Sequence, residues 1–352
     1  MVPCAAVVDD QPHASAPTKA SLDTVPTEIP PCPVCGDPGP PKPLFAARDV
    51  ATDRPGEFEV SRCDKCRCVH TSPRPTLEAL GSYYEDVYSG EGADEMKAMQ
   101  TGGGMRLVNQ ARFGLLDKHA RLSGESTLLD IGCGYGMFLR VAHERVACQL
   151  SGCDTDAGSL SGGVAADVAD LRAAEVEDAG WEAGSFDAVT LYHCLEHVPD
   201  PIRTLRTARS LLRPGGVLLV EVPNFGALWR RVFGRFWFPL LIPQHLVHFE
   251  LPVLRDAVGR AGWSDDEVIV HRGFWAPLEL VVSMGLAIKE VLGPPPETPR
   301  PLGRWLAHKL LALPMALLFF LGDIPLSLLL ARTPWSGHQV LVARKAGAGT
   351  GG

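Results

Sequence analysis

Residues 128–136 read Leu-Leu-Asp-Ile-Gly-Cys-Gly-Tyr-Gly, an apolar strand that ends in a carboxylate and runs into a glycine-rich loop. The carboxylate is Asp130, and the loop carries Gly132, Gly134 and Gly136. Because glycine has no Cβ and accepts positive φ, such a loop lets a ligand touch the backbone. Residues 137–145 continue as a helix-like run. The segment therefore predicts a strand, a ligand loop and a helix, and the ligand decides the function.

Two nucleotide-type ligands compete for this loop. A dinucleotide site normally reads G-x-G-x-x-G, with a pyrophosphate on the helix N-terminus, whereas here the third glycine comes one residue early. Asp130 would repel a pyrophosphate and attract an ammonium group, which S-adenosylmethionine (SAM) carries. The loop favours SAM, while a nicotinamide or flavin cofactor, or a tight turn without a ligand, stays open at this point.

Further carboxylates follow at the ends of the next two expected strands. Asp154 lies about 20 residues past the glycines, where a ribose diol is bound in related folds. Asp156 is a rival for that role. Glu175 is our candidate for the adenine rim, with Glu177 and Asp178 as neighbours that could replace it.

Two more segments extend the pattern. Residues 185–201 read SFDAVTLYHCLEHVPDP, and residues 211–224 read LLRPGGVLLVEVPN. Together with 128–136 they resemble three successive motifs of the class I SAM-dependent methyltransferases, in particular the subgroup of ubiquinone-type O-methyltransferases. The resemblance runs from about residue 125 to 270, with a final strand at 338–343. It implies an α/β fold, a Rossmann-like seven-stranded sheet with helices on both faces.

Apolar periodicity and breakers place the elements of this core. Helices are expected at 105–121, 137–146, 157–169, 200–212 and 251–261. Strands are expected at 127–131, 148–153, 171–176, 186–192, 216–222 and 266–271. Repeated βα units predict a parallel sheet with right-handed crossovers, whose ligands bind beyond the carboxyl ends of the strands. Asp130, Asp154 and the loop 192–197 fall on that edge.

Composition sets the frame. The chain has 352 residues, 46% of them hydrophobic, which indicates two domains or one enlarged domain with a sizeable core. A formal net charge of −8 does not favour a nucleic-acid partner. The N-terminus lacks a basic stretch followed by an apolar one. Without such a signal, the ten cysteines are expected in a reducing cytoplasm.

Four cysteines form two C-x-x-C knuckles, namely Cys32, Cys35, Cys63 and Cys66. Four thiolates in this pattern predict a closed, structural zinc site rather than a catalytic one. Disulfides are the alternative, and the spacing between the knuckles is somewhat longer than usual. Cys68 is a spare thiol or a replacement ligand, and His70 is a weaker candidate. The pattern resembles the N-terminal zinc ribbon of many such methyltransferases.

Histidines near the expected site suggest how a methyl group could be transferred. The protein must align the nucleophile and exclude water, and an oxygen nucleophile also needs a base, for which histidine is suited. His197 is our first candidate as base or substrate contact, and His245 the second. His193 is expected to contact cofactor or pocket wall. Each of these residues could instead be a hydrogen-bonded structural histidine.

Two insertions carry the information on substrate and surroundings. Residues 224–244 mix aromatic side chains with arginines, which suits a lid over an apolar or anionic substrate or a helix packed on the core. Residues 273–336 contain two apolar runs, Leu310–Leu321 and Ile324–Ala331, broken by prolines and Asp323. The breaks favour a helical cap, or a peripheral membrane contact through 305–331, over a membrane span.

The sequence thus divides into seven segments. They are a disordered leader (1–30), a zinc-ribbon-like module (31–75), a helical linker or lid (76–124), a SAM-binding core (125–272), an apolar helical insert (273–336), a final core strand (337–346) and a disordered tail (347–352). The expected activity is methyl transfer to a hydroxyl of a small glycan, lipid-linked or secondary-metabolite intermediate. The alternatives are an RNA-modifying methyltransferase and a SAM-binding module without catalysis. The acceptor and the oligomeric state do not follow from the sequence.

Overall fold

The computed structural model describes residues 25–49, 54, 56–88, 93–272, 279–292, 321–323, 325–331 and 333–347. Most of the predicted leader and tail, and most of the apolar run Leu310–Leu321, lie outside these residues. None of the described helices is long and apolar enough to cross a membrane.

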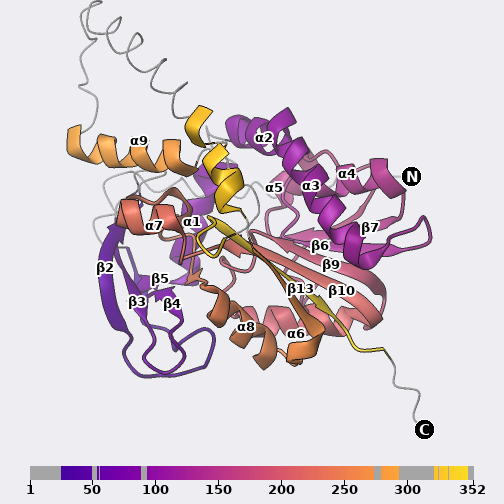
Figure 1. Ribbon diagram of the computed structural model, residues 1–352, viewed down its shortest axis with the longest axis horizontal. Helices are drawn as coiled ribbons and strands as arrows, with labels where there is room; N and C mark the ends of the chain where they lie inside the picture. Colours follow the sequence, from indigo (N-terminus) through magenta and orange to yellow (C-terminus); the bar gives the residue numbers. More distant parts are fainter. Residues whose placement is uncertain are drawn as a thin grey trace, which may run out of the picture.

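A seven-stranded sheet forms the centre of the fold (Figure 1). Its order is β12-β13-β10-β9-β6-β7-β8. The strands are β6 (Thr127–Ile131), β7 (Gln149–Asp154), β8 (Asp170–Ala173), β9 (Phe186–Tyr192), β10 (Leu212–Pro223), β12 (Val268–Arg272) and β13 (His338–Arg344). Five neighbours from β8 to β10 are parallel, whereas β13 runs antiparallel to both β10 and β12. The predicted Rossmann-like sheet is confirmed.

Helices cover both faces of this sheet. They are α3 (Gly103–Ala120), α4 (Met137–Val146) and α5 (Ala157–Gly162) on one side, and α6 (Pro201–Leu211) and α8 (Leu251–Arg260) on the other (Figure 1). Successive residues of a strand point to opposite faces, so Leu128 packs with α3 and α4 while Leu129 packs with α6 and α8. This two-sided burial explains why the strands read as continuous apolar runs.

One helix is shorter than its pattern predicts. The expected helix 157–169 ends at Gly162, and the chain then turns toward the glycine loop. A Cβ at Gly163 would lie 2.7 Å from the carbonyl oxygen of Tyr135, and Val164 N–H donates to that oxygen over 2.8 Å. The glycine pair therefore ends the helix because only a residue without a side chain allows this close approach.

A second sheet lies next to the cysteine knuckles. It has the order β11-β4-β3-β2, from β2 (Lys42–Arg48), β3 (Glu57–Arg62), β4 (Val69–Thr71) and β11 (Val247–His248). The knuckles are in the turns before β2 and between β3 and β4. A short pair of strands, β1 (Thr27–Glu28) and β5 (Arg74–Pro75), lies beside it. The edge strand of the four-stranded sheet, β11, comes from a distant part of the chain, and its Val247 lies opposite His70 of β4. The knuckle sheet is thus completed by residues of the expected core.

The remaining helices connect or cover these sheets. They are α1 (Leu77–Tyr88), α2 (Ala93–Thr101), α7 (Leu228–Phe233), α9 (Glu279–Leu292) and the short turns η2 (Gly234–Phe236), η3 (Phe238–Leu240) and η4 (Asp265–Glu267). Phe225 and Trp237 of the aromatic segment are each 1% exposed and pack with Phe58 and Tyr83 of the N-terminal part. These aromatic residues therefore pack the segment 224–244 against the N-terminal sheet, although α7 itself buries no residue. The lid role of this segment stays a prediction.

Candidate functional site

The glycine loop joins β6 to α4 in a backbone conformation that needs glycine. Gly132, Gly134 and Gly136 have φ values of 72°, 49° and 75°. A Cβ on Gly132 would lie 2.7 Å from the sulfur of Cys194, and one on Gly136 would lie 2.5 Å from the Cβ of Ala165. Gly132 therefore brings the glycine loop against the loop that follows β9.

Helix α2 lies over the same loop. A Cβ on Gly134 would lie 3.1 Å from Oε1 of Gln100, and the Tyr135 hydroxyl donates to the carbonyl of Ala93 over 3.5 Å. Both contacts come from the segment that the sequence predicts as a linker or lid.

Asp130 is buried at the carboxyl end of β6. Its exposed fraction is 3%, and the Thr190 hydroxyl donates to its Oδ1 over 2.7 Å. Burial raises the pKa of Asp130 to about 7, because removal from water disfavours the charged carboxylate. A ligand ammonium at this position would stabilise the ionised form.

Asp154 ends the neighbouring strand β7. Its Oδ2 accepts from Gly134 N–H over 2.9 Å, and its Oδ1 accepts from Asp156 N–H over 3.0 Å. Burial raises the pKa of Asp154. Asp156, the predicted rival, instead caps α5 through the N–H groups of Gly158 and Ser159.

Glu175 follows β8 and is exposed. Although the residue as a whole is exposed, protein atoms around its carboxyl group displace part of the water, which raises the pKa of Glu175, and the charges of Glu177 and Asp154 raise it further. Glu177 accepts a hydrogen bond from the Thr204 hydroxyl over 2.9 Å. Glu175 therefore lies on the Asp154 side of the sheet, and its adenine role stays a prediction.

A buried ionic network lies beside the carboxyl edge of the seven-stranded sheet. Arg112 of α3 donates to Glu221 of β10 from Nε over 3.1 Å and from its terminal nitrogen over 2.7 Å. His193, directly after β9, contacts Glu221 Oε1 at 3.2 Å and Glu196 Oε1 at 3.0 Å. Burial lowers the pKa of His193, but these carboxylates outweigh it and raise the pKa to about 9. His193 is therefore a cation between two carboxylates at neutral pH.

The predicted bases lie on the other side of Glu196. The rings of His197 and His245 stack edge to face with centroids 4.5 Å apart, and His245 Nε2 lies 3.9 Å from Glu196 Oε1. His197 Nδ1 lies 3.1 Å from the carbonyl oxygen of Gln244 and 2.9 Å from the Tyr84 hydroxyl. Burial lowers the pKa of both histidines, so both rings are neutral at pH 7.

Sequence reasoning missed three members of this cluster. Arg112, Glu221 and His338 belong to the ionic network around His193, and none of them was among the candidates. His338 joins this network because its Nδ1 lies 3.6 Å from Glu221 Oε1. The signal was present, because Glu221 is a charged residue within the apolar run of β10. A lone charge in a buried strand requires a partner.

The four knuckle cysteines form one group. Their sulfur atoms all lie within 4.8 Å of one another. Cys32 Sγ is 3.5 Å from Cys66 Sγ, and Cys35 Sγ is 3.6 Å from Cys63 Sγ. Sulfur ligands about 2.3 Å from a tetrahedral zinc ion lie roughly 3.8 Å apart, whereas a disulfide requires about 2.05 Å. All described cysteines are free, so the geometry fits zinc and contradicts the disulfide alternative.

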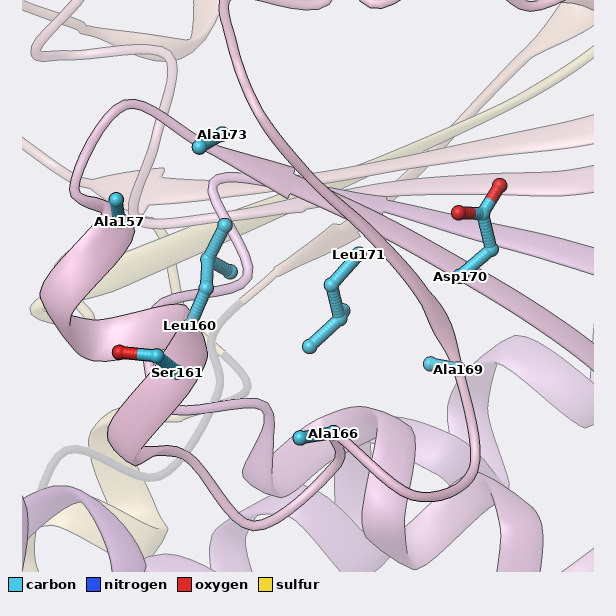
Figure 2. Close-up of a pocket in the computed structure, with 8 residues that line it drawn as sticks. All are labelled: Ala157, Leu160, Ser161, Ala166, Ala169, Asp170, Leu171 and Ala173. Carbon is cyan, nitrogen blue, oxygen red and sulfur yellow. The ribbon is translucent and has the colours of Figure 1, made fainter. Parts of the chain in front are cut away.

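A separate hollow of about 410 Å³ lies between α5 and β8. Figure 2 shows Leu160 and Leu171 extending into it, with small alanines around them. It lies next to the point where α5 ends early. It contains none of the predicted site residues, and its lining mixes alanine and leucine side chains with the polar groups of Ser161 and Asp170.

A seven-stranded sheet of this order, with a glycine loop and acidic strand ends at its carboxyl edge, is the arrangement that the three sequence motifs led us to expect. In agreement, residues 108–268 match the family described as "Methyltransferase domain". The matched segment contains all three sequence motifs, and this part of the chain is similar to the class I SAM-dependent methyltransferases.

The chain also resembles curated enzymes. It is 33% identical over 154 residues to a ubiquinone biosynthesis O-methyltransferase of Xanthomonas campestris pv. campestris, covering 42% of this chain and 64% of the relative. It is 37% identical over 157 residues to the enzyme of the same name from Xanthomonas axonopodis pv. citri, with the same coverage. The matched part thus spans less than two thirds of these relatives.

Among solved structures, phosphoethanolamine N-methyltransferase 2 of Haemonchus contortus in complex with SAM is similar. The identity is 15%, the match covers 79% of this chain and 63% of the other, and the TM-score is 0.48. A similarity at this level carries no argument about substrate.

Proposed function

We propose that the protein transfers a methyl group from SAM to a hydroxyl of a small molecule, on a glycan, lipid-linked or secondary-metabolite intermediate. The observation that carries this proposal is the contact between two loops. The glycine loop at the end of β6 touches Cys194, three residues before His197 in the loop after β9. A methyl donor and a base would therefore meet at one edge of the sheet.

The residues at the glycine loop fit SAM. Asp130 offers a buried carboxylate with a hydrogen bond from Thr190 and no salt bridge among the described residues, which suits the ligand's ammonium group. We assign Asp154 to the ribose hydroxyls and Glu175 to the adenine rim. When bound, SAM supplies the methyl group together with its own leaving group. The chain has only to orient the acceptor, exclude water and receive a proton.

We assign to His197 the role of receiving that proton. A carbonyl oxygen can only accept, so the contact with Gln244 fixes the proton on Nδ1 of His197 and leaves a lone pair on Nε2. The lowered pKa keeps the ring neutral, which a base requires. His193 is a poor base because it is already protonated. His245 is oriented in the same way by Pro239, but it is only 4% exposed and ranks second.

We also infer a structural Zn²⁺ held by Cys32, Cys35, Cys63 and Cys66. Four thiolates leave no open position for substrate, so the metal would stabilise the N-terminal sheet. The free thiols fit a reducing compartment. Peripheral membrane contact through 305–331 remains part of the proposal, supported by the exposed side chains of Leu328 and Leu329.

The proposal is tested in two steps. Calorimetric titration with SAM comes first, followed by S-adenosylhomocysteine release in the presence of hydroxylated acceptors. Because the curated relatives are named for ubiquinone biosynthesis, hydroxylated precursors of ubiquinone are the first acceptors to try, with hydroxylated glycans as the second class. Failure to bind SAM would overturn the proposal. Binding without turnover on any acceptor would favour a SAM-binding module.

A further inference from the structure

The cysteine cluster has a buried side that the four-cysteine site does not use. Cys68 is fully buried at the end of the second knuckle, and His70 lies two residues further on β4 with an exposed fraction of 2%. The sulfurs of Cys32 and Cys68 and a ring nitrogen of His70 all lie within 4.8 Å of one another. Cys32 therefore belongs to two groups of potential metal ligands.

His70 lacks the hydrogen bonds that a buried imidazole needs. Neither ring nitrogen has a hydrogen bond of normal geometry among the described residues. Buried polar groups are nearly always satisfied, and an unpaired one calls for an explanation such as an ion. A metal ion beside Cys32 and Cys68 would give one of these nitrogens a partner.

We propose that the cluster holds a second ligand set for its metal, formed by Cys32, Cys66, Cys68 and His70. The inference rests on the zinc site proposed above. Cys66 is the available fourth ligand, because its sulfur lies 3.5 Å from that of Cys32 and also interacts with that of Cys68. It does not lie within 4.8 Å of all three other ligand atoms, so it has to move toward them in the exchange. Three thiolates and one imidazole are a common ligand set for structural zinc. Cys32 and Cys66 are shared, while Cys35 and Cys63 are exchanged for Cys68 and His70.

The two sets differ in their access to solvent. Cys35 is partly exposed, whereas Cys68 and His70 are buried. Exposed thiolates are the first to be oxidised or alkylated, so the first set is the vulnerable one. In the exchange, the bonds from the metal to Cys35 and Cys63 break, and bonds to Cys68 sulfur and His70 nitrogen form. Cys68 gives up its proton and a released thiolate takes one up. The second set would therefore retain zinc after Cys35 is lost.

The test uses the full-length protein and measures metal content and cobalt spectra. The double variant C35S/C63S removes the first set and leaves the second. We expect it to retain about one equivalent of zinc, and its cobalt-substituted form to give a tetrahedral spectrum with fewer thiolate-to-metal transitions than wild type. Adding H70A or C68S to this variant should weaken zinc binding by at least ~10-fold. The matched control C35S/C63S/C148S removes a thiol elsewhere in the core and should retain the metal.

The outcomes separate the two proposals. Wild-type protein without zinc would overturn the zinc site itself. Wild-type protein with zinc, and a folded C35S/C63S variant without it, would overturn only the second set. Equal zinc retention with and without His70 would overturn it as well. If the double variant does not fold, as judged by circular dichroism and elution volume, the single variant C35S is compared with C35S/H70A by the same measurements.

Discussion

Two buried clusters of metal-binding residue types lie in this molecule, and they differ in how their charges are compensated. At the sheet edge, Arg112 and His193 face Glu221 and Glu196, so cations and anions alternate through direct contacts. In the knuckle cluster, cysteine sulfurs face one another, and the ring nitrogens of His70 have no hydrogen bond of normal geometry within the described part of the chain. Residue type alone therefore does not define a metal site. The first cluster is suited to holding and moving protons, and the second fits the metal ion that we propose for it.

The largest effect expected is loss of the shared cysteine. Cys32→Ser removes a ligand from both sets, and structural zinc in small modules is bound with about 10–16 kcal/mol of apparent free energy. We expect zinc loss and a lower Tm, measured by metal analysis and thermal unfolding. Cys148→Ser, which removes a buried thiol from the hydrophobic cluster between the central sheet and helices α3 and α4, should leave the zinc content unchanged. A C32S protein that keeps its full zinc content would contradict the assignment of Cys32 to both ligand sets.

The next effect concerns turnover. His197→Gln should lower the rate of S-adenosylhomocysteine release by ~10²–10⁴-fold, the usual contribution of a positioned base, with SAM affinity unchanged by calorimetry. Tyr84→Phe removes only the hydroxyl at Nδ1 and should cost less. In wild type, the rate should fall as the pH drops through the lowered pKa of His197, where the ring becomes protonated. Normal turnover in H197Q together with an inactive H245Q would identify His245 as the base.

The ionic network predicts a loss of stability. Glu221→Gln leaves Arg112 and His193 without their shared carboxylate, and breaking a buried pair costs about 3–5 kcal/mol in the free energy of unfolding. Denaturant titration measures it.

The same network predicts a pH dependence. The raised pKa of His193 means that its stabilisation is fully present below about pH 6.5, its ordinary value, and is lost as the pH rises through about 9. E221Q should show a weaker loss over this range. An unchanged pH profile would mean that Glu196 alone holds the proton on His193.

A smaller effect is expected at the ribose position. Asp154→Ala should weaken SAM binding by roughly 1.5–3 kcal/mol, the range for a hydrogen bond to a charged group. Calorimetry at fixed pH measures it, and Asp156→Asn, which keeps an N-cap for α5, is the control that should bind SAM normally. Unchanged affinity in D154A would remove Asp154 from the ribose role.

The smallest effect is a pH dependence of SAM binding itself. Because burial raises the pKa of Asp130 to about 7, the carboxyl group is neutral at pH 6 and cannot attract an ammonium. Affinity should be ~10-fold weaker at pH 6 than at pH 8. Thr190→Val removes the hydrogen bond that lowers this pKa, so the transition should move to higher pH. Equal affinity at both pH values in wild type would separate Asp130 from the ligand.

Local pattern was sufficient for most of the core. The strand that ends at Asp130, the glycine loop and the C-x-x-C knuckles are each contained within a few residues, so their structures follow from the sequence. The charge of Glu221 within an apolar strand indicated that it needs a partner, but which residues fill that role could not be predicted, because Arg112 and His193 come from α3 and the end of β9 and meet Glu221 only in the folded sheet. The early end of α5 depends in the same way on a tertiary contact, between Gly163 and Tyr135.

The shared strand β11 has a consequence for engineering. Thr71 N–H donates to the carbonyl of Leu246, and its hydroxyl donates to the carbonyl of His245. A shortened protein that keeps only the methyltransferase half would strip these bonds from the segment that fixes His197. It would also leave an unpaired strand edge open to self-association. The first seventy-five residues are therefore a poor candidate for deletion or for transplantation onto another enzyme. Separating the two halves would leave backbone groups on each side without their hydrogen-bond partners.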